Sequence, residues 1–238
     1  MKAVVLAGGK GTRLRPYTVA FPKPLMPVGN MPILEIIIKQ LKIHGINEVI
    51  LAVGHLAELI MTYFGDGSKF GIKIRYSRED EPLGTAGPLS LLRDELDDTF
   101  IVMNGDILTT LNYSELIEFH KKNGAIATIA LNRRDVYIDF GVVKIDGALN
   151  IVDYIEKPTL HYLVSMGVYV FEPKVLDYIP YKKKFDFPDL VKRLIEAGEK
   201  VKGFVYDGYW LDIGRPEDYE KANAEIDKIY NKLFKVKG

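Results

Sequence analysis

A glycine-rich segment near the N-terminus combines backbone amides and basic side chains in a pattern suited to phosphate binding. Residues 8–14 have the sequence G-G-K-G-T-R-L and follow the apolar run 2–6. Glycines allow the backbone to approach an anion closely, and the N–H groups of residues 8–12 are then free to bind it. Arg13 adds a guanidinium that can hold phosphate oxygens in pairs, and Lys23 follows in a proline-stiffened stretch. The segment therefore predicts binding of a polyphosphate.

Two common phosphate-binding loops do not fit this segment. A dinucleotide-binding loop needs a third glycine where the sequence has Leu14, and the second predicted strand ends without the expected ribose-binding acid. A P-loop needs Gly-Lys-Ser or Gly-Lys-Thr followed by a helix, whereas this segment continues through Arg13 and Arg15 into Pro16. The loop therefore belongs to a different class.

Short apolar strands alternate with helices in the first half of the chain. Strands are predicted at 2–6, 48–53, 72–76 and 100–103, and helices at 33–45, at 56–64 and within 82–94. This alternation predicts an α/β fold with a Rossmann-like mixed, mainly parallel sheet flanked by helices, which binds ligands beyond the carboxyl ends of its strands. Gly8, Gly9 and Asp106 fall at such ends. Five prolines predict a long loop at 16–32.

The second half of the chain has a different character. Strands are predicted at 125–131, 141–145, 151–155, 164–171, 201–206 and 209–211, with helices at 113–122, 187–197 and 216–234. Few helices separate the first four of these strands, which predicts a smaller antiparallel lobe. Because no linker rich in Gly, Ser or Pro interrupts the chain, we expect a single domain, 1–238, with halves at about 1–124 and 125–238.

Composition and charge limit the range of partners. Basic and acidic residues number 32 each, so no overall field attracts the chain to nucleic acid or to an anionic membrane. No apolar run approaches the ~20 residues of a membrane span, and no segment has the pattern of a signal peptide. The absence of cysteine excludes disulfides and Cys-based metal sites. These features predict a cytoplasmic protein with small-molecule substrates and with no nucleic-acid or membrane partner, and they are compatible with a homo-oligomer.

The motifs also resemble those of a known family. Residues 8–14, followed by F-P-K-P-L at 21–25, resemble the signature G-G-x-G-T-R-L…K-P of sugar-1-phosphate nucleotidyltransferases. The resemblance continues through short motifs at 82–87, 105–106, 140–143, 156–158 and 210–214. It implies a Mg²⁺-dependent displacement at the α-phosphorus of a nucleoside triphosphate by a sugar-1-phosphate. The products are a nucleoside diphosphate sugar and pyrophosphate. No general base is needed, because the attacking phosphate is already ionised.

The resemblance also implies roles for individual residues. Arg13 and Lys23 are the expected catalytic residues, and Asp106 and Asp212 the expected Mg²⁺ ligands. The expected nucleotide-binding residues are Leu6, Ala7, Gly8, Gly9, Gly11, Thr12, Pro82, Gly84 and Thr85. The residues expected to bind the sugar phosphate, within the antiparallel lobe, are Gly141, Glu156 and Lys157. Without the resemblance, each carboxylate would be interpreted as a turn or cap residue.

Residues 82–89 and 23–27 look most like the mannose-1-phosphate guanylyltransferase branch, which implies GTP and mannose-1-phosphate as substrates. Other pairs remain open, namely glucose-1-phosphate with dTTP, UTP or CTP, and heptose-1-phosphate with GTP. The chain has Ser165-Met166-Gly167 where relatives often have Asn-Ala-Gly beside the sugar, which leaves the sugar least defined. A non-catalytic subunit that senses nucleotide sugars is the alternative of a different class. We expect no C-terminal β-helix domain of the kind found in many relatives.

Overall fold

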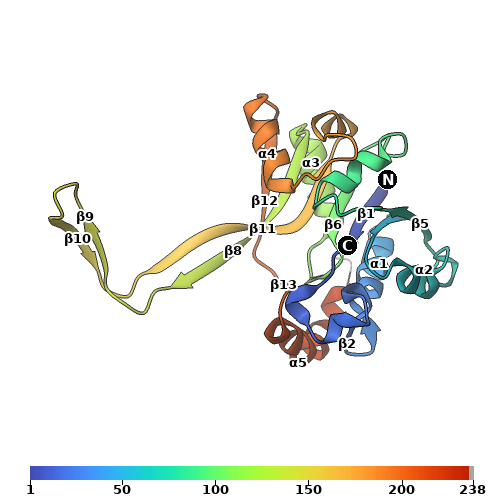
Figure 1. Cartoon of the computed structure of the whole chain (residues 1–238), viewed down its shortest axis with the longest axis horizontal. Coiled ribbons are helices and arrows are strands. Elements are labelled where there is room, and N and C mark those ends of the chain that lie inside the picture. The colour runs from blue at the N-terminus through green and yellow to red at the C-terminus, as the bar shows by residue number, and fades with distance from the viewer. Residues whose placement is uncertain (236–238) are drawn as a thin grey trace.

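A seven-stranded sheet forms the centre of the computed structural model, which describes residues 1–235 (Figure 1). Its strands, in spatial order, are β12 (Val201–Tyr206), β8 (Ala127–Tyr137), β11 (Thr159–Phe171), β6 (Phe100–Asn104), β1 (Lys2–Ala7), β4 (Glu48–Val53) and β5 (Lys73–Arg78). Only β11 runs antiparallel to its neighbours. The prediction of a Rossmann-like, mainly parallel sheet is confirmed. Residues 236–238 of the expected domain lie outside the described residues.

Helical layers cover both faces of the sheet, and β1 shows why. Ala3 and Val5 belong to one buried hydrophobic cluster and Val4 to another, because successive side chains of a strand point to opposite faces. The first cluster packs against α1 (Ile33–Ile43), α2 (Ala57–Phe64), α3 (Tyr113–Asn123) and α5 (Pro216–Leu233), and the second against α4 (Phe187–Glu196). None of the helices within residues 1–235 has the length and hydropathy that a membrane span requires.

The helix expected within residues 82–94 is a 3-10 helix, Gly87–Leu92, and not an α-helix. Pro88 lies in its first turn, and the buried Leu89 and Leu92 are three residues apart. A helix with three residues per turn places such a pair on one face, toward the sheet. The predicted helix is therefore present, as a short 3-10 helix.

The remaining strands form short two-stranded pairs outside the central sheet. They are β2 (Pro27–Val28) with β3 (Met31–Pro32), β7 (Ile107–Thr109) with β13 (Trp210–Asp212), and β9 (Val142–Ile145) with β10 (Ile151–Ile155). All three pairs are antiparallel. The loop predicted at 16–32 contains the first of these pairs and short 3-10 turns.

Strands β8 and β11 continue well beyond the sheet. Asn132 is the last residue of β8 that pairs with β12, and from there β8 and β11 pair only with each other, up to Tyr137 and Thr159. The ribbon then passes into β9 and β10, and Figure 1 shows it projecting far from the body of the molecule. We call residues 133–163 the arm. The predicted strands 125–131 and 164–171 are too short. Strand β8 continues through Arg133, Arg134 and Asp135, whose charges resemble a loop in sequence, and β11 already begins at Thr159.

Candidate active site

A pocket with a volume of about 1010 Å³ opens at the carboxyl edge of the sheet. Residues directly after β1, β4, β5 and β6 line it, namely Gly8, Gly54, Glu79 and Gly105. This is where parallel α/β sheets bind ligands. All nine residues expected to bind the nucleotide also line the pocket: Leu6, Ala7, Gly8, Gly9, Gly11, Thr12, Pro82, Gly84 and Thr85.

The glycine loop is held in one conformation by its own contacts. Gly11 has a φ of 60°, which disfavours residues with a side chain, and a Cβ there would lie 2.9 Å from Cγ2 of Thr18. The Thr18 hydroxyl donates to the Gly11 carbonyl at 2.7 Å, and the Leu14 N–H donates to the same oxygen at 2.9 Å. The buried Leu14 side chain anchors the loop to the core. These contacts hold the end of the loop, from Gly11 to Leu14, in its present conformation.

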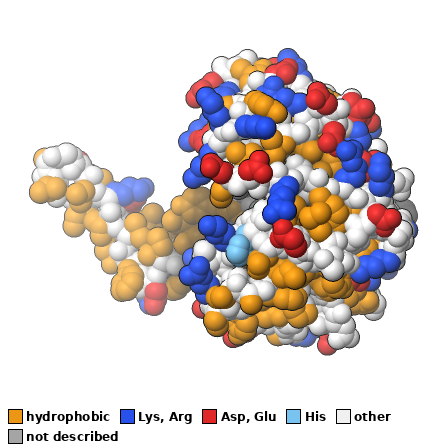
Figure 2. Space-filling model, turned by 45° about the vertical axis from the view of Figure 1, so that its right-hand side comes forward, with side chains coloured by type: hydrophobic (Ala, Val, Ile, Leu, Met, Phe, Trp, Pro, Cys, Tyr) orange, Lys and Arg blue, Asp and Glu red, His pale blue; other side chains and the backbone are white. Residues whose placement is uncertain are grey.

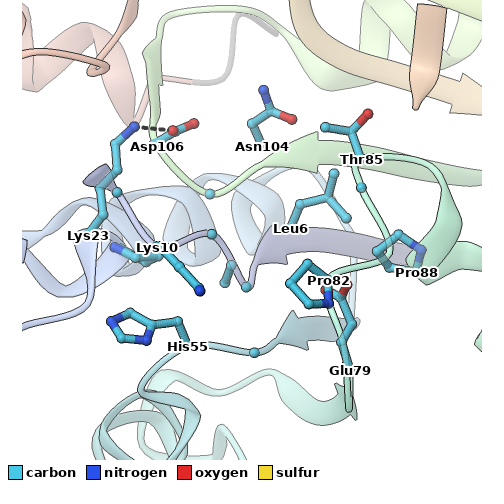
Figure 3. A pocket seen from close by; sticks show the side chains of 18 of the residues that line it. Leu6, Lys10, Lys23, His55, Glu79, Pro82, Thr85, Pro88, Asn104 and Asp106 are labelled. Atoms are coloured by element: carbon cyan, nitrogen blue, oxygen red, sulfur yellow. Dashed lines mark hydrogen bonds and ion pairs between the residues drawn. The ribbon is translucent and has the colours of Figure 1, made fainter. Parts of the chain in front are cut away.

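Basic residues and a carboxylate meet at one end of the pocket. Lys23 lies in a 3-10 turn, Lys23–Leu25, and its buried ammonium forms an ion pair with Asp106, as the dashed line in Figure 3 marks. Arg13 also lines the pocket, and its guanidinium lies within 3.5 Å of the point that a Cβ on Gly214 would occupy. The two residues expected to be catalytic are therefore at the same end, beside Asp106.

Strand pairing explains how Asp212 reaches Asp106 across more than a hundred residues. In the antiparallel pair β7–β13, Asp212 is opposite Ile107, and the Ile213 N–H donates to the Asp106 carbonyl at 3.0 Å. Burial and the nearby Asp106 charge raise the pKa of Asp212, while Lys23 and Arg13 oppose the shift. The two expected metal ligands are thus close enough to interact.

This pair of carboxylates fits a small, hard cation. Asp106 Oδ1 is buried and has no hydrogen-bond partner among residues 1–235, while Oδ2 is bound to Lys23. Mg²⁺ binds carboxylate oxygens and usually keeps several waters or phosphate oxygens. An unpaired buried carboxylate oxygen beside a second carboxylate is the donor set that such an ion requires, so the residues present are compatible with Mg²⁺.

Glu79 lies at the opposite end of the pocket, beside Pro82 and away from Lys23 and Asp106 (Figure 3). The Leu83 N–H donates to its Oε2 at 2.8 Å, and its Oε1 is 2.8 Å from the position of a Cβ on Gly8. Burial raises the pKa of Glu79, and the bond from Leu83 opposes this shift. Sequence reasoning missed Glu79; its place directly after a strand, before the Pro82–Gly84 turn, was the available signal.

A second missed residue, Asp186, holds the segment with Gly84 and Thr85 in place. Its Oδ1 accepts from the N–H and the hydroxyl of Thr85 at 2.8 and 3.1 Å. The Phe187 N–H, at the start of α4, donates to the Thr85 hydroxyl oxygen at 2.9 Å. These bonds tie the pocket wall to α4 over about a hundred residues of sequence. No local pattern could have connected the two segments.

The residues expected to bind the sugar phosphate are not in the pocket. Gly141, Glu156 and Lys157 all lie in the arm, where they form a separate group. The Tyr154 hydroxyl donates to Glu156 Oε2 at 3.1 Å and fills the space next to Gly141. Lys157 has a φ of 45° and forms an ion pair with Asp139 at 3.1 Å. Such backbone strain away from glycine is frequent at functional sites.

The fold and the pocket define a Rossmann-like α/β protein with a preformed glycine loop at the carboxyl edge of its sheet. The chain belongs to the nucleotidyl transferase family, whose model matches residues 2–229. Enzymes of this family generally use a divalent metal.

The chain is similar to several named proteins. It is 38% identical to a UTP–glucose-1-phosphate uridylyltransferase of Synechocystis over 93% of this chain and 62% of that protein. It is 40% identical to mannose-1-phosphate guanylyltransferase 1 of Arabidopsis thaliana over 92% of this chain and 63% of that protein. It thus spans less than two thirds of the length of these relatives. The structure is also similar to that of HddC from Yersinia pseudotuberculosis complexed with GMP-PN, with a TM-score of 0.73, 28% identity, and coverage of 94% of this chain and 99% of that chain.

Proposed function

We propose that the protein transfers a nucleotidyl group from a nucleoside triphosphate to a sugar-1-phosphate, with GTP and mannose-1-phosphate as the substrate pair. The observation that supports the reaction is the grouping of Arg13, Lys23 and two carboxylates beside a rigid glycine loop in one pocket. In the reaction, an oxygen of the sugar phosphate attacks the α-phosphorus. The bond from that phosphorus to the bridging oxygen breaks, and pyrophosphate leaves with the electron pair.

The residues of the pocket are suited to align and stabilise this displacement. N–H groups of the loop would hold the triphosphate, and Arg13 and Lys23 would neutralise charge that develops on the departing pyrophosphate. Asp106 and Asp212 would hold Mg²⁺, which screens the phosphate charges when bound. Lys23 would then move from Asp106 toward the phosphates.

Glu79 supports guanine as the base. Guanine presents two adjacent donors, N1–H and the N2 amino group, and one carboxylate can accept both. Uracil and thymine present one donor between two carbonyl oxygens, one of which would face the carboxylate. The position of Glu79 beside Gly8, distant from Lys23 and Asp106, is compatible with the base end of a bound nucleotide (Figure 3). The similarity to the guanylyltransferase of Arabidopsis thaliana agrees with this choice.

The decisive experiment is a matrix of GTP, UTP, dTTP, CTP and ATP against mannose-, glucose- and heptose-1-phosphate, with pyrophosphate release as the readout. We expect release only when Mg²⁺ and a sugar-1-phosphate are both present, with the highest kcat/KM for GTP and mannose-1-phosphate. A different pair with the highest kcat/KM would refute the substrate assignment but not the reaction.

A variant of the metal site tests the mechanism. Asp106→Asn should abolish Mg²⁺-dependent turnover, whereas Asp94→Asn, an exposed aspartate outside the pocket, should leave it unchanged. Unaltered turnover in Asp106→Asn would contradict the proposed metal site. If no pair releases pyrophosphate while nucleotide sugars still bind, the protein is a nucleotide-sugar sensor and the proposed reaction is wrong.

A further inference from the structure

The arm has an unusual concentration of exposed hydrophobic side chains. About half of the large hydrophobic residues that are exposed in residues 1–235 belong to it. They are Val136, Tyr137, Phe140, Val143, Ile145, Leu149, Ile151, Val152, Tyr154, Ile155, Leu160, Tyr162 and Leu163. Figure 2 shows this apolar surface along the arm, with few charged groups. Because a two-stranded ribbon is marginally stable alone in water, such a surface indicates an interaction with another surface.

The apolar side chains gather on defined faces of the ribbon. We call the part of the arm formed by β8 and β11 the stem. In the stem, Val136 and Leu160 are directly opposite each other and share a face. We call the part formed by β9 and β10 the tip. Successive side chains of β9 point to opposite faces, and the pairing with β10 adds two more residues to one of these faces. That face carries the apolar side chains of Val143, Ile145, Ile151 and Tyr154. The opposite face of the tip carries the ion pair between Lys144 and Asp153, at 2.9 Å. The arm therefore has a face built for contact.

The stem holds the tip away from the pocket of its own chain. Gly167 lies next to Val168, the first residue of β11 that pairs with β6, and packs against Asn104 in the pocket wall. From Gly167 to Thr159, β11 extends roughly 25 Å. Within the stem, residues 132–137 and 159–165 pair continuously and contain no glycine or proline that could act as a hinge. Lys157, beyond Thr159, is therefore far from Asp106 of the same chain.

We infer that the arm docks on a second copy of this chain and completes its active site, so that Glu156 and Lys157 act across the interface. This inference rests on the proposed function, which requires a sugar-phosphate site beside the triphosphate pocket. Strand β8 is parallel to β12 and antiparallel to β11, which is itself antiparallel to β6, so the arm leaves the body at the same edge as the pocket. Two copies facing each other at these edges exchange arms reciprocally, which gives a closed twofold dimer with two complete sites.

The body carries a surface that matches the arm. Tyr17, Val19 and Phe21 are exposed in the loop between Arg13 and Lys23, which both line the pocket. Apolar side chains are thus exposed in the loop that joins two pocket-lining residues, as well as on the arm. Contact between the arm and this loop of the partner removes the apolar side chains of both surfaces from water. It also brings the arm to the phosphate end of the partner pocket.

Complementation between two inactive variants tests exchange. Asp106→Asn damages the body and Lys157→Ala damages the arm, so each homodimer should be inactive. A heterodimer purified through two different affinity tags has one pocket with an intact body and an intact arm, and it should show about half of the wild-type pyrophosphate release. An inactive heterodimer would show that the arm serves its own chain and would overturn the inference.

A matched control combines two body variants. The heterodimer of Asp106→Asn with Asp212→Asn has no pocket with an intact body, so it should remain inactive. Activity in this control at the level of the first heterodimer would mean that complementation does not report on the arm, and would overturn the inference.

The docking itself is testable without catalysis, which separates it from the proposed function. In sedimentation velocity, the wild-type chain should be a dimer, and Val143→Lys combined with Ile145→Lys should be a monomer with the same melting temperature of the body. Lys144→Ala, on the opposite face of the same strand, should remain a dimer. A monomeric wild-type chain, or a dimer that persists in the double variant, would refute arm exchange even if the enzyme is active.

Discussion

Substitution of Glu79 by glutamine should change the preference among bases with little change in the shape of the pocket. The amide oxygen can still accept the bond from the Leu83 N–H, now 2.8 Å from Glu79 Oε2, so the adjacent turn should stay in place. The amide group, however, supplies one acceptor and one donor where the carboxylate supplied two acceptors. At least one hydrogen bond from guanine to a charged acceptor is lost, which costs about 1.5–3 kcal/mol.

This loss corresponds to a decrease of about 10- to 150-fold in the ratio of kcat/KM for GTP over UTP. The ratio should be measured by pyrophosphate release with mannose-1-phosphate held constant. Glu81→Gln is the matched control, because this exposed residue lines the same pocket and loses the same charge. A ratio in Glu79→Gln within about threefold of wild type, or an equal change in Glu81→Gln, would refute direct recognition of the base by Glu79.

Three further predictions concern other parts of the site and the core. Arg13→Lys should lower kcat about 10²- to 10³-fold with little change in KM, as expected for stabilisation of a transition state. Arg15→Lys, outside the pocket, should have no such effect, and a decrease confined to affinity would contradict this role. Asp186→Ala should raise KM for GTP about tenfold by freeing the pocket wall. Asp189→Ala, in the helix that Asp186 precedes, should not, and equal KM values for the two variants would exclude such positioning by Asp186. Burial lowers the pKa of His120 below its ordinary value of 6.5, so its contribution to stability is complete above that pH and is lost as the pH falls. His120→Gln should therefore lose less thermal stability than wild type between about pH 7.5 and 5.5, and an equal loss in melting experiments would show the reasoning to be wrong.

The sequence predicted those parts of the fold that depend on local patterns. Apolar runs such as residues 2–6 and 48–53 correspond to buried parallel strands, and each predicted α-helix outside 82–94 is present within a few residues of its expected bounds. The arm was not predicted, because Arg133, Arg134 and Asp135 are polar. They are held in a strand by pairing with β11, which a local pattern does not reveal.

The pocket was predictable only in part for a related reason. The glycine loop and Lys23 lie close in sequence, so motif spacing identified them together. The β7–β13 pairing places Asp212 near Asp106, and Asp186, directly before α4, accepts a hydrogen bond from the Thr85 N–H. Contacts between segments about a hundred residues apart depend on topology, which explains why Asp212 could be expected only from a family resemblance and Asp186 not at all.

The arm is attached to the body by two strands alone, and this has an evolutionary consequence. Substitutions or insertions between Tyr137 and Thr159 change neither the hydrophobic clusters that hold the sheet nor the glycine loop. Selection can therefore modify the arm while the rest of the chain remains constant. If the arm supplies the sugar-phosphate site, preferences for the sugar and for the base can diverge independently among descendants of one gene.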